Sequence, residues 1–287
     1  MPVTERFYML AGIRYRFLIP KDCPWDAVRT LTDYIAPPGP WDIDCILSTP
    51  EELAPPEGER CHHIPSLQVY RSGDRQISYY GSVAPSLEGA YLRIERQGAT
   101  SHIQLKASSF PKGITDDVIL TCMQAVHHIT EAGGFLLHAS WVCFRGKAIL
   151  FTGPSGIGKS TQAALWERCR GAELINGDRA AIFPTAEGAE VRGIPYCGSS
   201  GVNKNRTMPL AAVVCLSQAE ENSITRLPGL RAFRSLWEGC SIDLWNQEDI
   251  SKSTQAVADA VSAIPVFALA CTPDERAVQI LEKEGVF

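Results

Sequence analysis

Residues 148–161 of the chain read AILFTGPSGIGKST, and this stretch decides how the carboxyl-terminal half of the sequence is interpreted. Its opening run is almost entirely apolar, which predicts a strand buried inside a sheet. Gly153, Gly158, Lys159 and Ser160 then match the spacing G-x-x-x-x-G-K-[ST] of a phosphate-binding loop. An amphipathic helix is expected to begin near Lys159, as the phosphate-binding interpretation requires.

The glycines of this loop would let backbone N–H groups turn toward a polyphosphate, because side chains at those positions would block its approach. The positive end of the following helix would add to the attraction. Lys159 is expected to reach the β- and γ-phosphates, and Ser160 to ligate Mg²⁺. The nucleotide-binding candidates are nine consecutive residues: Gly153, Pro154, Ser155, Gly156, Ile157, Gly158, Lys159, Ser160 and Thr161.

Two further side chains are candidates for catalysis. Asp178 follows the short apolar segment 174–175, and it could hold Mg²⁺ or accept the proton of an attacking hydroxyl. A turn aspartate is the alternative. His138 lies in an otherwise apolar strand, where a hydrogen-bonded core histidine is the usual interpretation. Together with Asp178 and the loop, it becomes a candidate for orienting the carboxylate or adjusting its pKa.

A third candidate region is the segment 190–206, which is rich in glycine and small hydroxyl residues. It carries Arg192, Lys204 and Arg206, and a mobile loop could use these cations to close over phosphates. A solvated surface loop is the alternative.

The periodicity of the sequence changes near residue 115. Alternating segments such as 91–95 and 102–106 predict half-buried strands, so residues 1–112 are expected to form a small, mostly antiparallel β domain for substrate or peptide recognition. One helix is expected from Thr115 to Gly133, and residues 113–287 are expected to form an α/β catalytic domain. Its expected strands are 135–144, 148–152, 174–175, 180–183, 211–216 and 266–270, and its expected helices follow Lys159, Pro228, Asp249 and Pro273.

Bulk composition excludes several classes of protein. A net charge of -5 over 287 residues gives no general attraction to nucleic acid or to an anionic membrane. No segment approaches the length needed to cross a bilayer, so we expect a cytoplasmic protein. The 10 cysteines are dispersed, which favours reduced thiols. Cys61, His62 and His63 form the one local group that suggests a metal, and a surface loop is the default interpretation there.

Four consecutive features stand out: the strand with His138, the glycine-rich loop, a helix ending at Arg170 and a strand ending at Asp178. Together they resemble the catalytic domain of HPr kinase/phosphorylase, in the phosphoenolpyruvate carboxykinase superfamily. The resemblance covers residues 136–183, and 190–193 more loosely. It implies an α/β fold, a P-loop core of that superfamily joined to a mostly β amino-terminal domain. It also implies His138 and Asp178 as the catalytic pair, Lys159 acting on phosphates, a homo-oligomer, and ATP with Mg²⁺ held by Ser160 and Asp178.

The chain departs from that family at one position, because members usually show two adjacent acids where this sequence has Gly177 and Asp178. The departure argues against a reverse, phosphorolytic reaction. A looser resemblance is to HPr-kinase-like proteins of modified-peptide biosynthesis, which act as serine kinases on a precursor peptide.

The resulting prediction is an ATP- and Mg²⁺-dependent kinase that phosphorylates a hydroxyl, with a seryl side chain of a peptide or small protein as the leading acceptor. A small serine-like metabolite as acceptor and a regulatory, non-catalytic ATP-binding module remain as alternatives. A GTPase-like switch is disfavoured, because the segment 203–206 ends in arginine where a guanine-reading motif needs aspartate.

Overall fold

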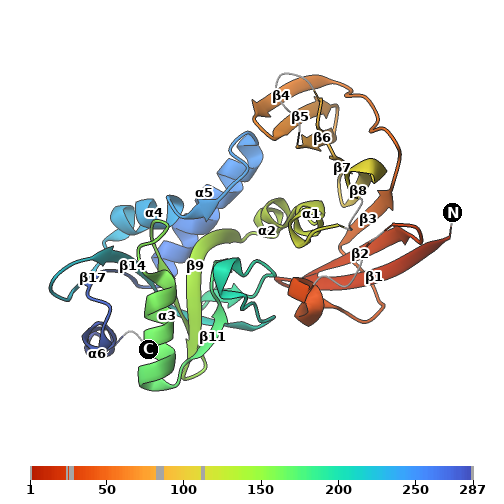
Figure 1. Ribbon diagram of the computed structural model, residues 1–287. Coiled ribbons are helices and arrows are strands. Elements are labelled where there is room, and N and C mark those ends of the chain that lie inside the picture. The colour runs from red at the N-terminus through yellow and green to blue at the C-terminus, as the bar shows by residue number, and fades with distance from the viewer. Residues whose placement is uncertain (1, 24, 26–28, 82–86, 111–113, 286–287) are drawn as a thin grey trace. The chain divides into compact units, whose positions relative to one another are not determined.

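The computed structural model describes residues 2–23, 25, 29–81, 87–110 and 114–285. The chain divides into two compact units between Gln124 and Ala125 (Figure 1). Each unit has its own sheet, and six α-helices are present among the described residues.

The first unit is built on an eight-stranded sheet in the order β1-β2-β3-β8-β7-β6-β5-β4. The β2–β3 and β3–β8 pairings are parallel and the others are antiparallel. In β8, Ile103 and Leu105 are buried while His102 is exposed, which confirms the half-buried strand expected there. The strands are β1 (Val3–Leu10), β2 (Ile13–Pro20), β3 (Ile43–Ser48), β4 (Glu59–Ile64), β5 (Leu67–Ser72), β6 (Arg75–Tyr80), β7 (Leu92–Gln97) and β8 (Thr100–Leu105), and the short 3-10 turns are η1 (Arg29–Tyr34) and η2 (Ala107–Ser109).

The single helix expected from residue 115 is wrong. Two helices occupy this region, α1 (Asp116–Cys122) and α2 (Ala125–Glu131). Gln124 between them has φ 44°, a left-handed conformation that a right-handed helix cannot continue through. The division between the two units falls at this break, so α1 belongs to the first unit.

The second unit contains a nine-stranded sheet whose main path is β10-β9-β12-β13-β14-β17-β15, with β11 and β16 both paired to β9. β10 also pairs with β14, so β10, β9, β12, β13 and β14 close a ring of strands. β10, β14 and β17 run parallel, which brings their carboxyl ends to one edge. The strands are β9 (Phe135–Phe144), β10 (Lys147–Thr152), β11 (Glu173–Asn176), β12 (Arg179–Thr185), β13 (Gly188–Arg192), β14 (Thr207–Gln218), β15 (Ser223–Arg226), β16 (Cys240–Ser241) and β17 (Val266–Cys271).

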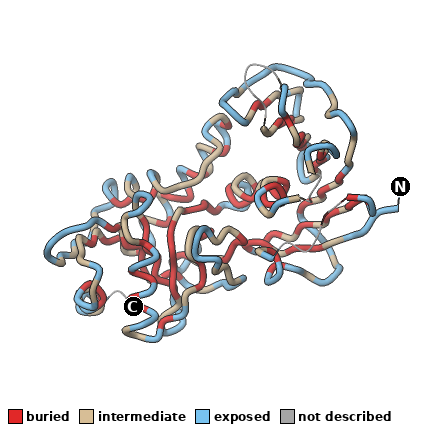
Figure 2. The backbone as a smooth tube through the Cα atoms, in the orientation of Figure 1, coloured by how far each residue is buried: buried red, intermediate tan, exposed pale blue. Residues whose placement is uncertain are grey.

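Helices cover both faces of this sheet, with α3 (Lys159–Arg170) and α6 (Glu275–Lys283) on one face and α4 (Gly229–Trp237) and α5 (Gln247–Ala263) on the other (Figure 1). Ile149 and Phe151 of β10 pack with Trp166 of α3, whereas Leu150 packs on the opposite face with Leu236 of α4. Figure 2 shows the central strands buried along their length. The mixed α/β architecture expected for this half is confirmed, as are its expected strands and helices.

Candidate functional site

The glycine-rich loop, residues 153–161, runs from the end of β10 into the first turn of α3. Gly153 has φ 140°, and a Cβ added there would lie 3.2 Å from both Ile157 Cγ2 and the Leu216 carbonyl oxygen. A larger residue would therefore open the loop. Because α3 begins at Lys159, its first backbone N–H groups lack intrahelical partners and are suited to binding an anion.

Lys159 is folded across this loop. Its Nζ donates hydrogen bonds to the carbonyl oxygens of Gly153 and Pro154, each at 3.1 Å, and the residue is 8% exposed. Burial lowers the pKa of Lys159, while the charge of Asp178 acts in the opposite direction. The ammonium group thus lies inside the loop, where it could exchange carbonyl contacts for phosphate contacts.

His138 and Asp178 lie together at the junction of β9 and β12. The backbone N–H of Ala139 donates to the Asp178 carbonyl at 3.0 Å, and His138 Nε2 is 3.4 Å from Asp178 Oδ1. Burial lowers the pKa of His138, the positive charge of Lys159 lowers it further, and Asp178 opposes both. The imidazole is therefore neutral at neutral pH, and its Nε2–H can donate to the carboxylate.

Asn176 fixes the backbone that carries Asp178, and it was not among the residues expected from sequence. Its fully buried side chain accepts hydrogen bonds from the N–H groups of Asp178 and Arg179 at 2.9 Å each. The same amide donates to the carbonyls of Ile194 and Tyr196 at 2.9 and 2.8 Å. An asparagine two residues before a turn aspartate is the signal for such an arrangement.

The space that a second acidic side chain would need at residue 177 is occupied by another part of the chain. A Cβ added to Gly177 would lie 2.0 Å from Ser200 Oγ, in the short turn η3 (Gly198–Ser200). A Cβ added to Gly198 of the same turn would lie 3.0 Å from Asp178. An acidic side chain at residue 177 therefore has no space unless this turn moves.

The cation beside Asp178 is Arg179, a residue that sequence reasoning gave no role. Its Nε lies 3.4 Å from Asp178 Oδ2, its Nη1 donates to Ser241 Oγ, and its guanidinium lies 5.7 Å from the ring centre of Tyr196. Arg179 is paired directly with His138 across the strands β12 and β9, so one register fixes both side chains.

Two of the three cations expected from sequence make contacts elsewhere. Arg192 ends β13, a strand within the segment expected to be a mobile loop, and its guanidinium lies 4.0 Å from the ring centre of Phe183. Lys204 Nζ lies 2.8 Å from Glu173 Oε1, and Arg206 is exposed.

The residues expected to hold Mg²⁺ offer oxygen atoms, the donor type this ion prefers. Ser160 is exposed in the first turn of α3, and Asp178 is a half-buried carboxylate. The donor set therefore fits the ion in chemical type.

The local group Cys61, His62 and His63 lies on the edge strand β4, not in the loop expected there. Among the described residues, the three side chains of metal-ligand type that come together are His127, Glu131 and Asp249, with ligand atoms within 4.8 Å of one another. His127 Nδ1 is 3.0 Å from Asp249 and Lys252 Nζ is 2.8 Å from Glu131, so these contacts join α2 to α5.

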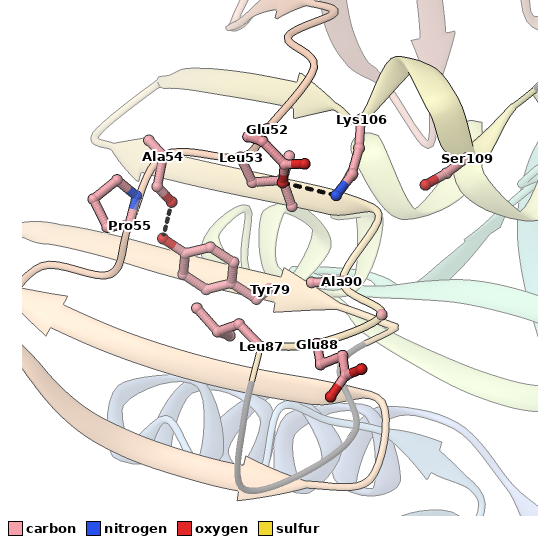
Figure 3. A pocket seen from close by; sticks show the side chains of 11 residues that line it. Glu52, Leu53, Ala54, Pro55, Tyr79, Leu87, Glu88, Ala90, Lys106 and Ser109 are labelled. Carbon is pink, nitrogen blue, oxygen red and sulfur yellow. Dashed lines mark hydrogen bonds and ion pairs between the residues drawn. The ribbon is translucent and has the colours of Figure 1, made fainter.

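A hollow in the first unit, with a volume of ≈ 310 Å³, is shown in Figure 3. At its wall Lys106 Nζ lies 2.7 Å from Glu52 Oε2, and the Tyr79 hydroxyl donates to the Ala54 carbonyl at 2.8 Å. Leu53 supplies apolar surface. No helix among the described residues is long and apolar enough to cross a membrane.

Comparison with known proteins gives one family and one solved structure to report. A family model described as SynChlorMet cassette protein ScmC matches residues 114–283, which is more than half of the chain. The HPr(Ser) kinase/phosphatase from Coxiella burnetii matches with 14% sequence identity over 52% of this chain and 95% of that chain, with a TM-score of 0.31. No curated protein matches.

Proposed function

We propose that this chain, which belongs to the family of the SynChlorMet cassette protein ScmC, is an ATP- and Mg²⁺-dependent kinase that phosphorylates a seryl hydroxyl. One observation carries the proposal: the His138–Asp178 pair lies beside the glycine-rich loop that buries Lys159, since the Thr152 hydroxyl just before the loop donates to the His138 carbonyl at 2.9 Å. Anion-binding groups and a candidate general base thus meet in one place.

In the proposed reaction the acceptor hydroxyl gives its proton to Asp178 while its oxygen attacks the γ-phosphorus. The new O–P bond forms as the bond to the β–γ bridging oxygen breaks, and ADP leaves. Lys159 and Arg179 stabilise the negative charge of the transferred group. His138 donates from Nε2 to Asp178 Oδ1. Asp178 Oδ2, which lies 3.4 Å from Arg179 Nε, takes the proton as the Arg179 guanidinium turns to the transferred group.

Ser160 and Asp178 would hold Mg²⁺, which supplies positive charge to the phosphate oxygens when bound. Arg192, Lys204 and Arg206 stay candidates for contacts with phosphate outside the immediate surroundings of Asp178. The turn that fills the space beside Gly177 favours a one-way kinase, since no second acid is available there.

We assign acceptor recognition to the first unit. Its hollow combines a paired acid and base with a tyrosine and leucines, a lining that suits a side chain of a peptide. A small serine-like metabolite is the competing acceptor, and it would not need this unit for binding.

Acceptor-dependent ADP release is the test of the proposed function. Wild-type protein with Mg·ATP should release ADP faster in the presence of peptides encoded beside its gene, and the Lys159→Ala variant should not. Binding of ATP without any acceptor-dependent release would favour the regulatory, non-catalytic module instead.

A further inference from the structure

A cavity of ≈ 410 Å³ lies next to the glycine-rich loop, and neither His138 nor Asp178 is among the residues that line it. Loop residues 156–158 and the first turn of α3 form one wall, and the carboxyl ends of β14 and β17 form the other. In α/β sheets, ligands bind in the crevice outside the carboxyl ends of parallel strands. The cavity is therefore continuous with the loop that would hold the phosphates.

Gln162 supplies an independent sign that the cavity takes a ligand. This residue lines the cavity and is 2% exposed, and its Nε2 donates to Cys271 Sγ at 3.2 Å. Its Oε1 has no hydrogen-bond donor among the described residues. A buried amide oxygen without a donor is costly, and a ligand that supplies an N–H would remove that cost. The terminal torsion of a glutamine is soft, so Oε1 can turn toward the cavity.

From these observations we infer that the cavity binds the adenine base of the phosphate donor, with Gln162 accepting a hydrogen bond from its exocyclic amino group. This inference rests on the proposed function and adds the place where the base of the donor binds and the residue that recognises it. It excludes pyrophosphate as an equivalent donor, because pyrophosphate has no group to fill the cavity.

The lining favours adenine over guanine. Guanine presents two adjacent N–H donors that a carboxylate satisfies, and none of the lining residues is acidic. The Asn203 and Lys204 pair that sequence alone offered as a guanine-reading motif lies elsewhere: Asn203 pairs with Asn176, and Lys204 with Glu173. Ile157 and Pro273 provide the apolar surface that a base stacks against.

A substitution that fills the cavity should distinguish binding of the base from binding of the phosphates. Ala219 is exposed on the cavity wall opposite the loop, so Ala219→Trp would occupy the base site while the loop keeps its own sequence. Wild-type protein should bind Mg·ATP at least tenfold more tightly than Mg·triphosphate, the inorganic ion, by titration calorimetry. Ala219→Trp should weaken Mg·ATP at least tenfold and leave Mg·triphosphate within twofold. Ala164→Trp, on an exposed position of α3, is the control and should change neither.

The role of Gln162 is tested with purine riboside triphosphate, which lacks the amino group of adenine. Wild-type protein should prefer ATP about tenfold, equivalent to about 1.4 kcal/mol. Gln162→Leu should bind both nucleotides equally, whereas the exposed control Gln255→Leu should keep the preference.

Three results would overturn the inference. One is equal binding of ATP and inorganic triphosphate by wild-type protein, and another is equal weakening of both by Ala219→Trp. Either result would show that the base does not bind in the cavity, while phosphate binding in the loop would still stand. A wild-type protein that binds neither ligand would remove the proposed function as well.

Discussion

At the scale of single residues, the proposed chemistry depends most on the carboxylate of Asp178. Asp178→Asn keeps the shape but removes the base, so we expect kcat to fall about 10²- to 10⁴-fold while Mg·ATP binding stays measurable. The rate of phosphate transfer to the acceptor is the quantity measured. Asp259→Asn, at an exposed position of α5, is the control. A rate within tenfold of wild type for Asp178→Asn would show that another group takes the proton.

The pH dependence follows from His138. Its pKa lies below the ordinary value of 6.5, first because of burial and then because of the charge of Lys159. The imidazole is neutral above pH 6.5 and gains its proton only below it. A charged imidazole would hold Asp178 more strongly, so kcat/KM should be level above pH 6.5 and fall on acidification. In His138→Gln this limb should move to lower pH, and a limb that stays in place would contradict the assignment.

The stability of the fold should change in the same direction. Because the folded-state pKa of His138 is depressed, the unfolded chain binds the proton more readily below pH 6.5. The contribution of neutral His138 to the free energy of unfolding is therefore complete above pH 6.5. It is lost as the pH falls from 6.5 through the folded-state pKa.

Arg179 and the expected cations can be separated by substitution. Arg179→Met should lower kcat about 10- to 100-fold, because its guanidinium lies beside Asp178 where the transferred group gains charge. Arg206→Met, at an exposed position, should have a smaller effect. The rate of phosphate transfer to the acceptor is measured for both variants. An equal loss of kcat would mean that cations of the segment 190–206 also stabilise the transferred group.

At the scale of elements, the turn η3 packs against the end of β11 only because residue 177, next to Ser200, has no side chain. Gly177→Ala would drive a Cβ into Ser200, so we expect a loss of about 1–3 kcal/mol in unfolding free energy and a lower kcat. Ser200→Gly removes the opposing atoms, and the double variant should recover activity relative to Gly177→Ala. Failure of this rescue, measured by denaturant unfolding and by rate, would show that the clash is relieved some other way.

Local patterns were sufficient for much of the second unit and insufficient elsewhere. The apolar run before Gly153 and the helix after it have strong periodic signals, so β10 and α3 were predicted correctly. The break at Gln124 has no such signal, because an apolar stripe continues through it. Strand β13 is short, and its pairing with β12 and β14 is a long-range property that a segment carrying Arg192 does not reveal.

The candidate site follows from the sequence in part for the same reason. His138 and Asp178 are candidates because their residue types stand out beside apolar strands, and the structure places them 3.4 Å apart. Asn176 and Arg179 were missed, because their roles depend on the register of β12 against β9 and on contacts with residues 194 and 196. The space beside Gly177 is likewise set by Ser200, which is distant in sequence.

At the scale of the whole molecule, each unit carries its own buried core, with Phe17 and Leu92 in the first and Trp141 and Leu150 in the second. Saturating Mg·ATP should therefore stabilise residues 125–287 selectively, by about 2.7 kcal/mol at one hundred times its Kd. Hydrogen exchange should show the gain in protection in that unit alone. An equal gain in residues 2–110 would mean that the two units open together.

The most direct measurement is mass spectrometry of peptides encoded beside this gene after incubation with the protein and Mg·ATP. The proposed kinase should add the mass of one phosphate to a serine of one such peptide, and Asp178→Asn should leave that peptide unchanged. Wild-type protein that binds Mg·ATP yet leaves every serine unmodified, or an Asp178→Asn variant that modifies the peptide at the wild-type rate, would contradict it.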